Sequence, residues 1–133
     1  MEKFSELIAK RRSMRKFTSE PLTADEVQLL LRSALISPTS KHTNGWQFIA
    51  VDDREILDKL ADCKSNGATF LKEAPFAVVV LGDTEVTDAW IEDCAIAAIM
   101  ILGLALRDFF AFLFACAIIY KLVKAKEMRV WLH

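Results

Sequence analysis

The sequence is poor in cysteine and lacks a strong excess of charge of either sign. Cys63, Cys94 and Cys116 are the three cysteines among 133 residues. Their odd number, without a close CxxC pair, favours a reducing compartment over a disulfide framework. Seventeen basic and eighteen acidic residues give a net charge of -1, which argues against a dedicated nucleic-acid-binding protein. We therefore expect neither a disulfide scaffold nor a nucleic-acid partner.

Targeting signals and long apolar runs are also missing. The residues after Met1 lack the apolar core of a secretion signal, so we expect an uncleaved, cytoplasmic protein. Residues 95–106 and 109–120 are apolar runs of 12 residues each, shorter than the roughly 18 to 20 residues that cross a bilayer. We therefore expect no membrane span. No Ser-His-Asp set, catalytic carboxylate pair or metal-ligand cluster stands out, so we predict no catalytic side chain and no metal site.

The length fits one domain with a hydrophobic core, although 133 residues are few for an enzyme that also encloses a cofactor. Thr23 and Glu26 have the capping-box spacing, which predicts a helix that begins at Ala24. Phe76 to Leu81 is continuously apolar, which predicts a strand buried on both faces at the centre of a sheet. The remaining pattern predicts helices at 3–10, 24–35, 54–63 and from 87 or 88 to about 106, a strand at 47–51 and a short link at 68–73.

Two of these helices carry patterns that predict how they pack. Phe4, Leu7 and Ile8 follow helical spacing and predict one buried stripe on the first helix. Residues 95–106 are apolar nearly all round, as expected of a helix inside a core or at a subunit interface.

A basic cluster at the end of the first helix is the first candidate binding element. Arg11, Arg12 and Arg15 place three guanidinium groups around Ser13. Each guanidinium carries a permanent charge and a planar fork of donors that matches two phosphate oxygens, so the cluster suits an anionic ligand. Short basic runs are also typical of solvated faces, membrane-surface contacts and nucleic-acid patches. Lys10 and Arg11 would also complement the dipole of the preceding helix. The cluster alone leaves these alternatives open.

Residues 37–46 form the second candidate, a loop rich in small hydroxyl side chains that leads into the strand at 47–51. Such a loop offers backbone and side-chain hydrogen bonds to a planar polar ligand, and the strand behind it provides a rigid base. An ordinary solvated connection would have the same composition. His42 by itself indicates nothing, because a lone loop histidine is usually just exposed.

Together the two stretches resemble the FMN-dependent nitroreductase family. Arg11-Arg12-Ser13-Met14-Arg15 is similar to that family's Arg-Arg-Ser-x-Arg opening, and Ser37-Pro38-Thr39-Ser40 before Trp46 is similar to its Pro-Ser loop before a Trp. Glu73-Ala74-Pro75 before an apolar strand is a third shared feature. The likeness runs from about Phe4 to about Met100.

The resemblance implies an α+β fold in which helices flank a mixed central sheet, and a homodimer with FMN at the subunit interface. It implies an oxidoreductase that uses NAD(P)H to reduce nitroaromatics, quinones or similar small molecules. By position, Arg11, Arg12, Ser13 and Arg15 would hold the FMN phosphate. Pro38, Thr39 and Ser40, expected from the partner subunit, would lie along the isoalloxazine ring. Asn66 is a further candidate for a polar contact to the flavin.

The last 33 residues depart from the family's pattern. The net charge is -4 through Met100 and +3 after it, and no strand equivalent to the family's next one stands out. We therefore divide the chain into a partial nitroreductase-like, FMN-binding domain at 1–100 and an atypical apolar helix with a basic tail at 101–133. One hypothesis is that the second part results from truncation or a shifted reading frame, which would leave the fold incomplete at the C-terminus.

The sequence thus supports two classes of function. The first is a flavin oxidoreductase. The alternative is a non-catalytic, truncated nitroreductase-like protein that acts only through association. A small membrane-associated protein that uses residues 95–120 is a third and weaker reading.

Overall fold

The computed structural model describes residues 3–10, 15–63, 66–107 and 120–121. The helices are α1 (Phe4–Lys10), α2 (Ala24–Leu35), α3 (Arg54–Asp62) and α4 (Trp90–Arg107), with short 3-10 helices η1 (Ser40–His42) and η2 (Thr69–Lys72). The strands are β1 (Trp46–Val51), β2 (Ala77–Gly82) and β3 (Tyr120–Lys121). Arg11, Arg12, Ser13, Cys116 and most of the apolar run at 109–120 lie outside the described residues.

The three strands form one mixed sheet in the order β1-β2-β3. β1 pairs antiparallel with β2, from Trp46 opposite Gly82 to Val51 opposite Ala77, and β2 pairs parallel with β3. All six residues of β2 are buried, which confirms this run as the centre of the sheet. The α+β class with a mixed sheet between helices is likewise confirmed.

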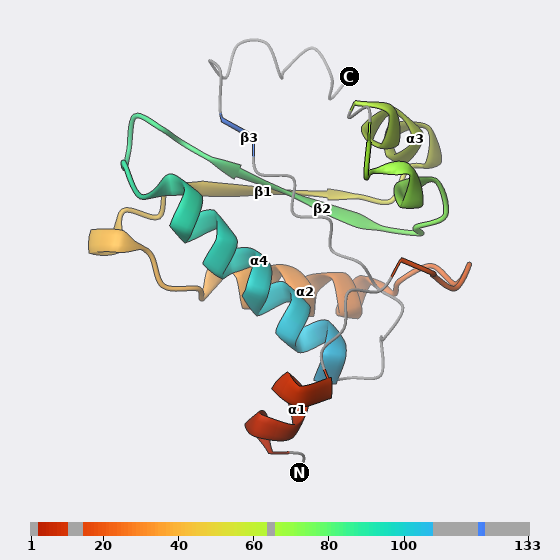
Figure 1. The fold of residues 1–133 in the computed structure, drawn as a ribbon, viewed down its shortest axis with the longest axis horizontal. Coiled ribbons are helices and arrows are strands. Elements are labelled where there is room, and N and C mark those ends of the chain that lie inside the picture. Colours follow the sequence, from red (N-terminus) through yellow and green to blue (C-terminus); the bar gives the residue numbers. More distant parts are fainter. Residues whose placement is uncertain (1–2, 11–14, 64–65, 108–119, 122–133) are drawn as a thin grey trace.

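One face of the sheet packs against α2 and α4 (Figure 1). Val78 and Val80 of β2, with Phe76 just before the strand, meet residues of both helices in a single buried cluster. The helix residues are Leu30 and Ala34 of α2 and Cys94 and Ile101 of α4. Gly82 at the end of β2 permits a close approach of α4, because a Cβ there would lie 2.9 Å from the Cys94 sulfur. Helix α4 therefore rests directly on the end of the strand.

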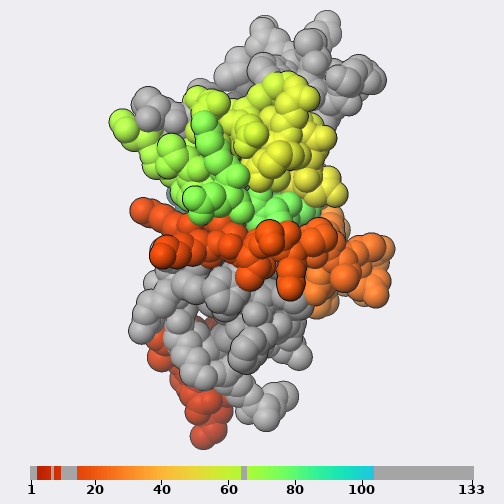
Figure 2. Space-filling model, turned by 90° about the vertical axis from the view of Figure 1, so that its right-hand side faces the viewer, coloured from red at the N-terminus to blue at the C-terminus, as the bar shows by residue number. Residues whose placement is uncertain are grey.

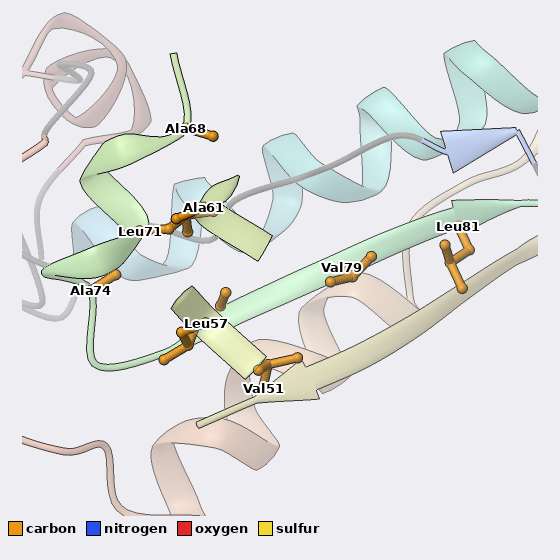
Figure 3. Packing of buried hydrophobic residues seen from close by; sticks show 9 residues of the cluster. Val51, Leu57, Ala61, Ala68, Leu71, Ala74, Val79 and Leu81 are labelled. Carbon is orange, nitrogen blue, oxygen red and sulfur yellow. The ribbon is translucent and has the colours of Figure 1, made fainter. Parts of the chain in front are cut away.

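The opposite face packs against α3 and η2. Figure 3 shows Leu57 and Ala61 of α3 and Leu71 of η2 gathered over Val79 and Leu81 of β2. The two-residue alternation of β2 thus supplies both cores, as expected for a strand buried on both faces.

Local capping signals place two of the helices. Thr23 and Glu26 form both hydrogen bonds of the capping box, so α2 begins at Ala24 as predicted. Asp53 caps α3 by accepting a hydrogen bond from the Ile56 N–H at 3.0 Å. On this helix Leu57 is buried, whereas the neighbouring Ile56 is 37% exposed.

Two other expectations are wrong. Phe4 and Ile8 of α1 are exposed rather than buried, because this short helix lies against α4, away from the sheet (Figure 1). A short strand, β3, does follow α4. On α4 itself the buried face runs through Asp93, Cys94, Ala97, Ala98 and Ile101, while Ile91 and Ile99 are exposed in the single chain.

The segment between α1 and α2 lies beside the second core. Figure 2 shows residues 15–23, in orange-red, running across one side of the molecule next to the yellow and green layer that contains α3 and η2. Phe17 contacts Phe70 of η2, with ring centroids 6.3 Å apart. Across the part of the chain that the structure describes, no helix has both the length and the apolar character needed to cross a membrane.

Candidate functional site

The loop of residues 37–44 starts where α2 ends. The Ser37 hydroxyl donates a hydrogen bond of 2.6 Å to the carbonyl of Ala34, and the Ile36 N–H donates to the carbonyl of Arg32 at 3.2 Å. Ser37 is buried and Pro38, next in the chain, is exposed. The loop is therefore firmly attached to the helix before its exposed part begins.

The backbone of this loop is strained. Lys41, His42 and Asn44 have φ angles of 52°, 56° and 50°. The left-handed region costs roughly 1–2 kcal/mol for a residue with a Cβ, although Asn tolerates it better than most. Such strain persists only where the surroundings impose it, and it is typical of binding and catalytic loops.

A reciprocal pair of hydrogen bonds closes the loop. The Thr39 hydroxyl donates to Oδ1 of Asn44 at 3.0 Å and accepts from the Asn44 N–H at 3.1 Å. The His42 N–H also donates to the Thr39 carbonyl at 3.3 Å. These bonds occupy Thr39 within the loop itself.

The loop is also bonded to α4. The Ser40 N–H donates to Oδ1 of Asp93 at 2.8 Å, and Asp93 is only 3% exposed. Asp93 Oδ2 and Trp46 Nε1 are the buried side-chain polar atoms without a hydrogen-bond partner among the described residues. Trp46 begins the strand directly after the loop. Native proteins rarely leave buried polar atoms unpaired. The two unpaired atoms therefore favour a binding site in this part of the molecule.

These contacts show which predicted loop groups remain for a ligand. Pro38 has no N–H, and Thr39 is bonded to Asn44. The Ser40 carbonyl accepts from the N–H and hydroxyl of Thr43. Within the described segments, no hydrogen bond engages the Ser40 hydroxyl. Of the three predicted residues, Ser40 therefore offers the side-chain donor.

The remaining predicted site residues lie elsewhere. Arg15 is exposed on the segment that leads into α2, and Asn66 is exposed between α3 and η2. Arg11, Arg12 and Ser13 lie outside the described residues. In Figure 1, η1 is at the left end of the molecule, whereas the segment from Arg15 to α2 is at the right end. Helix α2 separates them, and its 12 residues span about 18 Å. Within one chain, the segment that begins at Arg15 and the 37–44 loop therefore lie on either side of α2.

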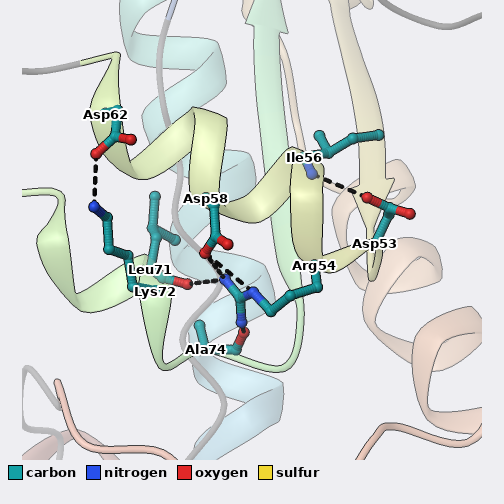
Figure 4. A network of polar contacts seen from close by, with 8 residues as sticks. All are labelled: Asp53, Arg54, Ile56, Asp58, Asp62, Leu71, Lys72 and Ala74. Carbon is teal, nitrogen blue, oxygen red and sulfur yellow. Dashed lines mark hydrogen bonds and ion pairs between the residues drawn. The ribbon is translucent and has the colours of Figure 1, made fainter.

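A second polar cluster joins α3 to η2 (Figure 4). Arg54 donates to the carbonyls of Leu71 and Ala74 at 2.8 and 2.9 Å and pairs with Asp58 at 3.0 Å. Nearby, Lys72 pairs with Asp62 at 2.8 Å, which raises the pKa of Lys72. The contacts of these side chains join α3 to the η2 segment, so we assign the cluster to stability rather than to binding.

Cys94, next to Asp93 in α4, is not suited to reactive chemistry. Burial, with a smaller contribution from the Asp93 carboxylate, raises the pKa of its thiol to about 11. The reactive form of cysteine is the thiolate, so this thiol stays neutral at physiological pH. Nor does any group of three or more His, Cys, Asp or Glu side chains within the described part of the chain form a metal site.

Comparison with known proteins decides the family. The nitroreductase family matches residues 8–122 of this chain. The chain belongs to the nitroreductase family. The match covers both candidate motifs and continues past Met100, where the sequence likeness was expected to end; the division into 1–100 and 101–133 remains a proposal.

Individual nitroreductases support this assignment. The chain is 31% identical over 101 residues to an Archaeoglobus fulgidus protein that bears the provisional name NADH dehydrogenase/NAD(P)H nitroreductase, covering 73% of this chain and 58% of that protein. It is 41% identical to the FMN-dependent nitroreductase CDR20291_0767 from Clostridium difficile R20291, with a TM-score of 0.74 over 76% of this chain and 59% of that one.

A more distant structure shares the fold. The nitroreductase of Bacteroides fragilis NCTC 9343, solved with bound FMN, is 23% identical with a TM-score of 0.67, covering 80% of this chain and 66% of that one. The present chain therefore spans between about half and two thirds of the length of the relatives that it matches.

The sequence reasoning missed Asp93. The only available signal was an acidic residue beside Cys94, in a helix whose following turns are apolar. That signal has no specific meaning without the position of the 37–44 loop, which lies 53 residues earlier in the chain.

Proposed function

We propose that this protein is an FMN-dependent oxidoreductase that uses NAD(P)H to reduce a small-molecule acceptor such as a nitroaromatic or a quinone. The main support is the family match over residues 8–122 together with 41% identity to an FMN-dependent nitroreductase. When bound, FMN supplies hydride chemistry that protein side chains lack. The protein then has to bind and orient the cofactor, so a dedicated catalytic side chain is not required.

The described residues suit such a ligand. The strained loop presents the Ser40 hydroxyl, which has no hydrogen-bond partner among the described residues. Asp93, which accepts from the Ser40 N–H, and Trp46, which begins β1, each have one buried polar atom without a partner among those residues. Arg15 is exposed and available to an anionic group. In this proposal Arg11, Arg12, Ser13 and Arg15 hold the FMN phosphate, Pro38, Thr39 and Ser40 line the flavin ring, and Asn66 makes a polar contact to the ring.

We further propose that the site forms between two copies of the chain. The separation of Arg15 and Ser40 by the length of α2 supports this arrangement, because the loop would then come from the partner subunit. Helices α1, α2 and α4 also expose large apolar side chains, as an interface requires. These are Phe4, Ile8, Leu29, Leu35, Ile36, Ile91, Ile96, Ile99 and Met100.

Purified protein tests the cofactor. A yellow preparation with the absorbance of oxidised flavin, or one that takes up added FMN, is expected. A colourless protein that does not bind added FMN would contradict the proposal and favour the non-catalytic alternative. The acceptor and the choice of NADH or NADPH can then be measured by steady-state rates with each compound.

The double variant Arg11→Ala with Arg15→Ala tests the phosphate contact. Each lost charge-assisted hydrogen bond is worth roughly 1.5–3 kcal/mol, so we expect FMN affinity to fall by at least about tenfold per arginine. Quenching of flavin fluorescence measures the dissociation constant. Lys16→Ala is the matched control, since Lys16 is equally exposed and adjacent. Unchanged affinity in the double variant would remove both arginines from the site.

The variant Ile99→Glu tests the dimer. Ile99 is 59% exposed on α4, and a charge there would be desolvated in an interface. We expect light scattering after size-exclusion chromatography to show a shift from dimer toward monomer and a loss of FMN. Glu92→Lys, an exposed change at the start of the same helix, serves as the control. A wild-type protein that is monomeric with FMN bound would overturn the shared site.

A further inference from the structure

The burial of Asp93 is unfavourable in free energy. Its side chain is 3% exposed, Oδ1 has the Ser40 N–H as its partner, and Oδ2 has none among the described residues. Burial of a carboxylate is unfavourable unless it is well paired, and an apolar side chain often fills such a position at lower cost. Its place in the first turn of α4 offsets part of this cost through the helix dipole. Packing alone does not explain an acid here.

The contact that Asp93 makes is with the strained loop. Ser40 immediately precedes Lys41 and His42, the two consecutive left-handed residues. The Thr39 and Asn44 bonds close the loop on itself but do not fix its place on the protein. The Ser40–Asp93 bond joins it to α4, which is held against β2 by the close packing at Gly82. Asp93 thus fixes the position of the loop relative to α4 and the sheet.

From this arrangement we infer that Asp93 is a positioning residue for the cofactor: by holding the Ser40 N–H it fixes the Ser40 hydroxyl in the orientation that contacts FMN. The inference rests on the proposed function.

Three variants test it. Asp93→Ala removes the acceptor, while Asp93→Asn retains an oxygen that can accept from Ser40. Asp53→Ala is the matched control, because Asp53 also accepts a backbone N–H, from Ile56 at 3.0 Å, but on α3. If Asp93→Ala does not fold, Asp93→Leu replaces it. Leucine also removes the acceptor and the buried charge, and it leaves a smaller cavity than alanine does.

The first measurement needs no flavin. Hydrogen exchange of the Ser40 amide, followed by NMR, should be faster in Asp93→Ala or Asp93→Leu and close to wild type in Asp93→Asn and Asp53→Ala. The second is the FMN dissociation constant, which we expect to rise roughly tenfold or more in Asp93→Ala and much less in Asp93→Asn, as for loss of a charge-assisted hydrogen bond. Asp53→Ala should leave it unchanged.

The outcomes separate the two proposals. Unchanged Ser40 exchange in the alanine and leucine variants overturns the positioning role. So does an unchanged FMN dissociation constant in these variants when the wild-type protein binds FMN. An equal loss in Asp93→Asn and Asp93→Ala would also overturn it, because the retained acceptor should rescue the loop. A wild-type protein that never binds FMN contradicts the proposed function and, with it, the cofactor-positioning role, whereas the exchange measurement still reports on the loop anchor alone.

Discussion

Arg54 and Asp93 are two charged residues that each reach backbone groups far along the chain, on opposite faces of the same sheet. Arg54 contacts the carbonyls of Leu71 and Ala74 and the carboxylate of Asp58. Asp93 is far more buried, yet only one of its two oxygens has a partner among the described residues. Asp93, whose burial costs more free energy, is therefore the residue with a buried polar atom that lacks a hydrogen-bond partner.

This difference separates a stabilising contact from a candidate functional one. Arg54, which joins α3 to η2, is explained by stability, because its contacts lie within the layer that it holds together (Figure 4). A half-paired buried carboxylate attached to a strained loop is not explained in this way. The face of the sheet that carries α2 and α4 is accordingly where we place the ligand-contacting loop.

The largest effect on stability within this comparison is expected for Arg54→Ala. This variant removes two hydrogen bonds to carbonyls of the η2 segment. We expect the free energy of unfolding to fall by about 2 kcal/mol, a value that already allows for the partial exposure of the side chain. Urea denaturation measures the change. Any loss of FMN affinity should follow from this loss of stability, because the 37–44 loop is on the other face of the sheet.

Asp58→Ala is the control for this prediction. It removes only the exposed ion pair on α3 and should cost no more than about 0.5 kcal/mol. If both variants destabilise the protein equally, the carbonyl contacts are not what holds η2. If Arg54→Ala weakens FMN binding while stability is unchanged, the functional separation of the two faces is wrong.

A smaller effect is expected at Lys41. Glycine accepts a φ of 52° without steric cost, so Lys41→Gly should relieve strain of about 1–2 kcal/mol. The added freedom of the unfolded chain offsets roughly 0.5–1 kcal/mol of this gain. We expect a net stabilisation of about 0.5 kcal/mol, measured by thermal or urea unfolding.

Lys41→Ala is the matched control, because it removes the same side chain and keeps the strained backbone. It should show no gain in stability. A gain of the same size in both variants would mean that the lysine side chain, and not the backbone of the loop, is responsible.

Much of the fold could be predicted from local patterns in the sequence. The spacing of Thr23 and Glu26 gave the start of α2 because a capping box satisfies backbone donors within one turn. The apolar run at 76–81 indicated the central strand because both faces of β2 must be covered. The family resemblance likewise depended on two short motifs that can be recognised without knowledge of the packing.

Other features depended on partners that are distant in sequence. Phe4 and Ile8 have helical spacing, but whether a stripe is buried depends on what lies against it, and α1 does not reach the sheet. On α4, nearly every position is apolar, so periodicity could not identify the face that packs on β2. The closeness of α4 at Gly82 decides that face.

By itself, the sequence determined the order of the main helices and strands, the family, and the two motifs that predict a flavin site. The tertiary structure decided that the segment from Arg15 and the 37–44 loop lie on either side of α2. It also decided that the Thr39 hydroxyl is bonded within the loop, whereas the Ser40 hydroxyl has no partner among the described residues. It also revealed Asp93 beneath the loop. The physical reason is that caps and periodicity act over a few residues, whereas the contact between Ser40 and Asp93 joins two segments that only the packing of α4 on the sheet brings together.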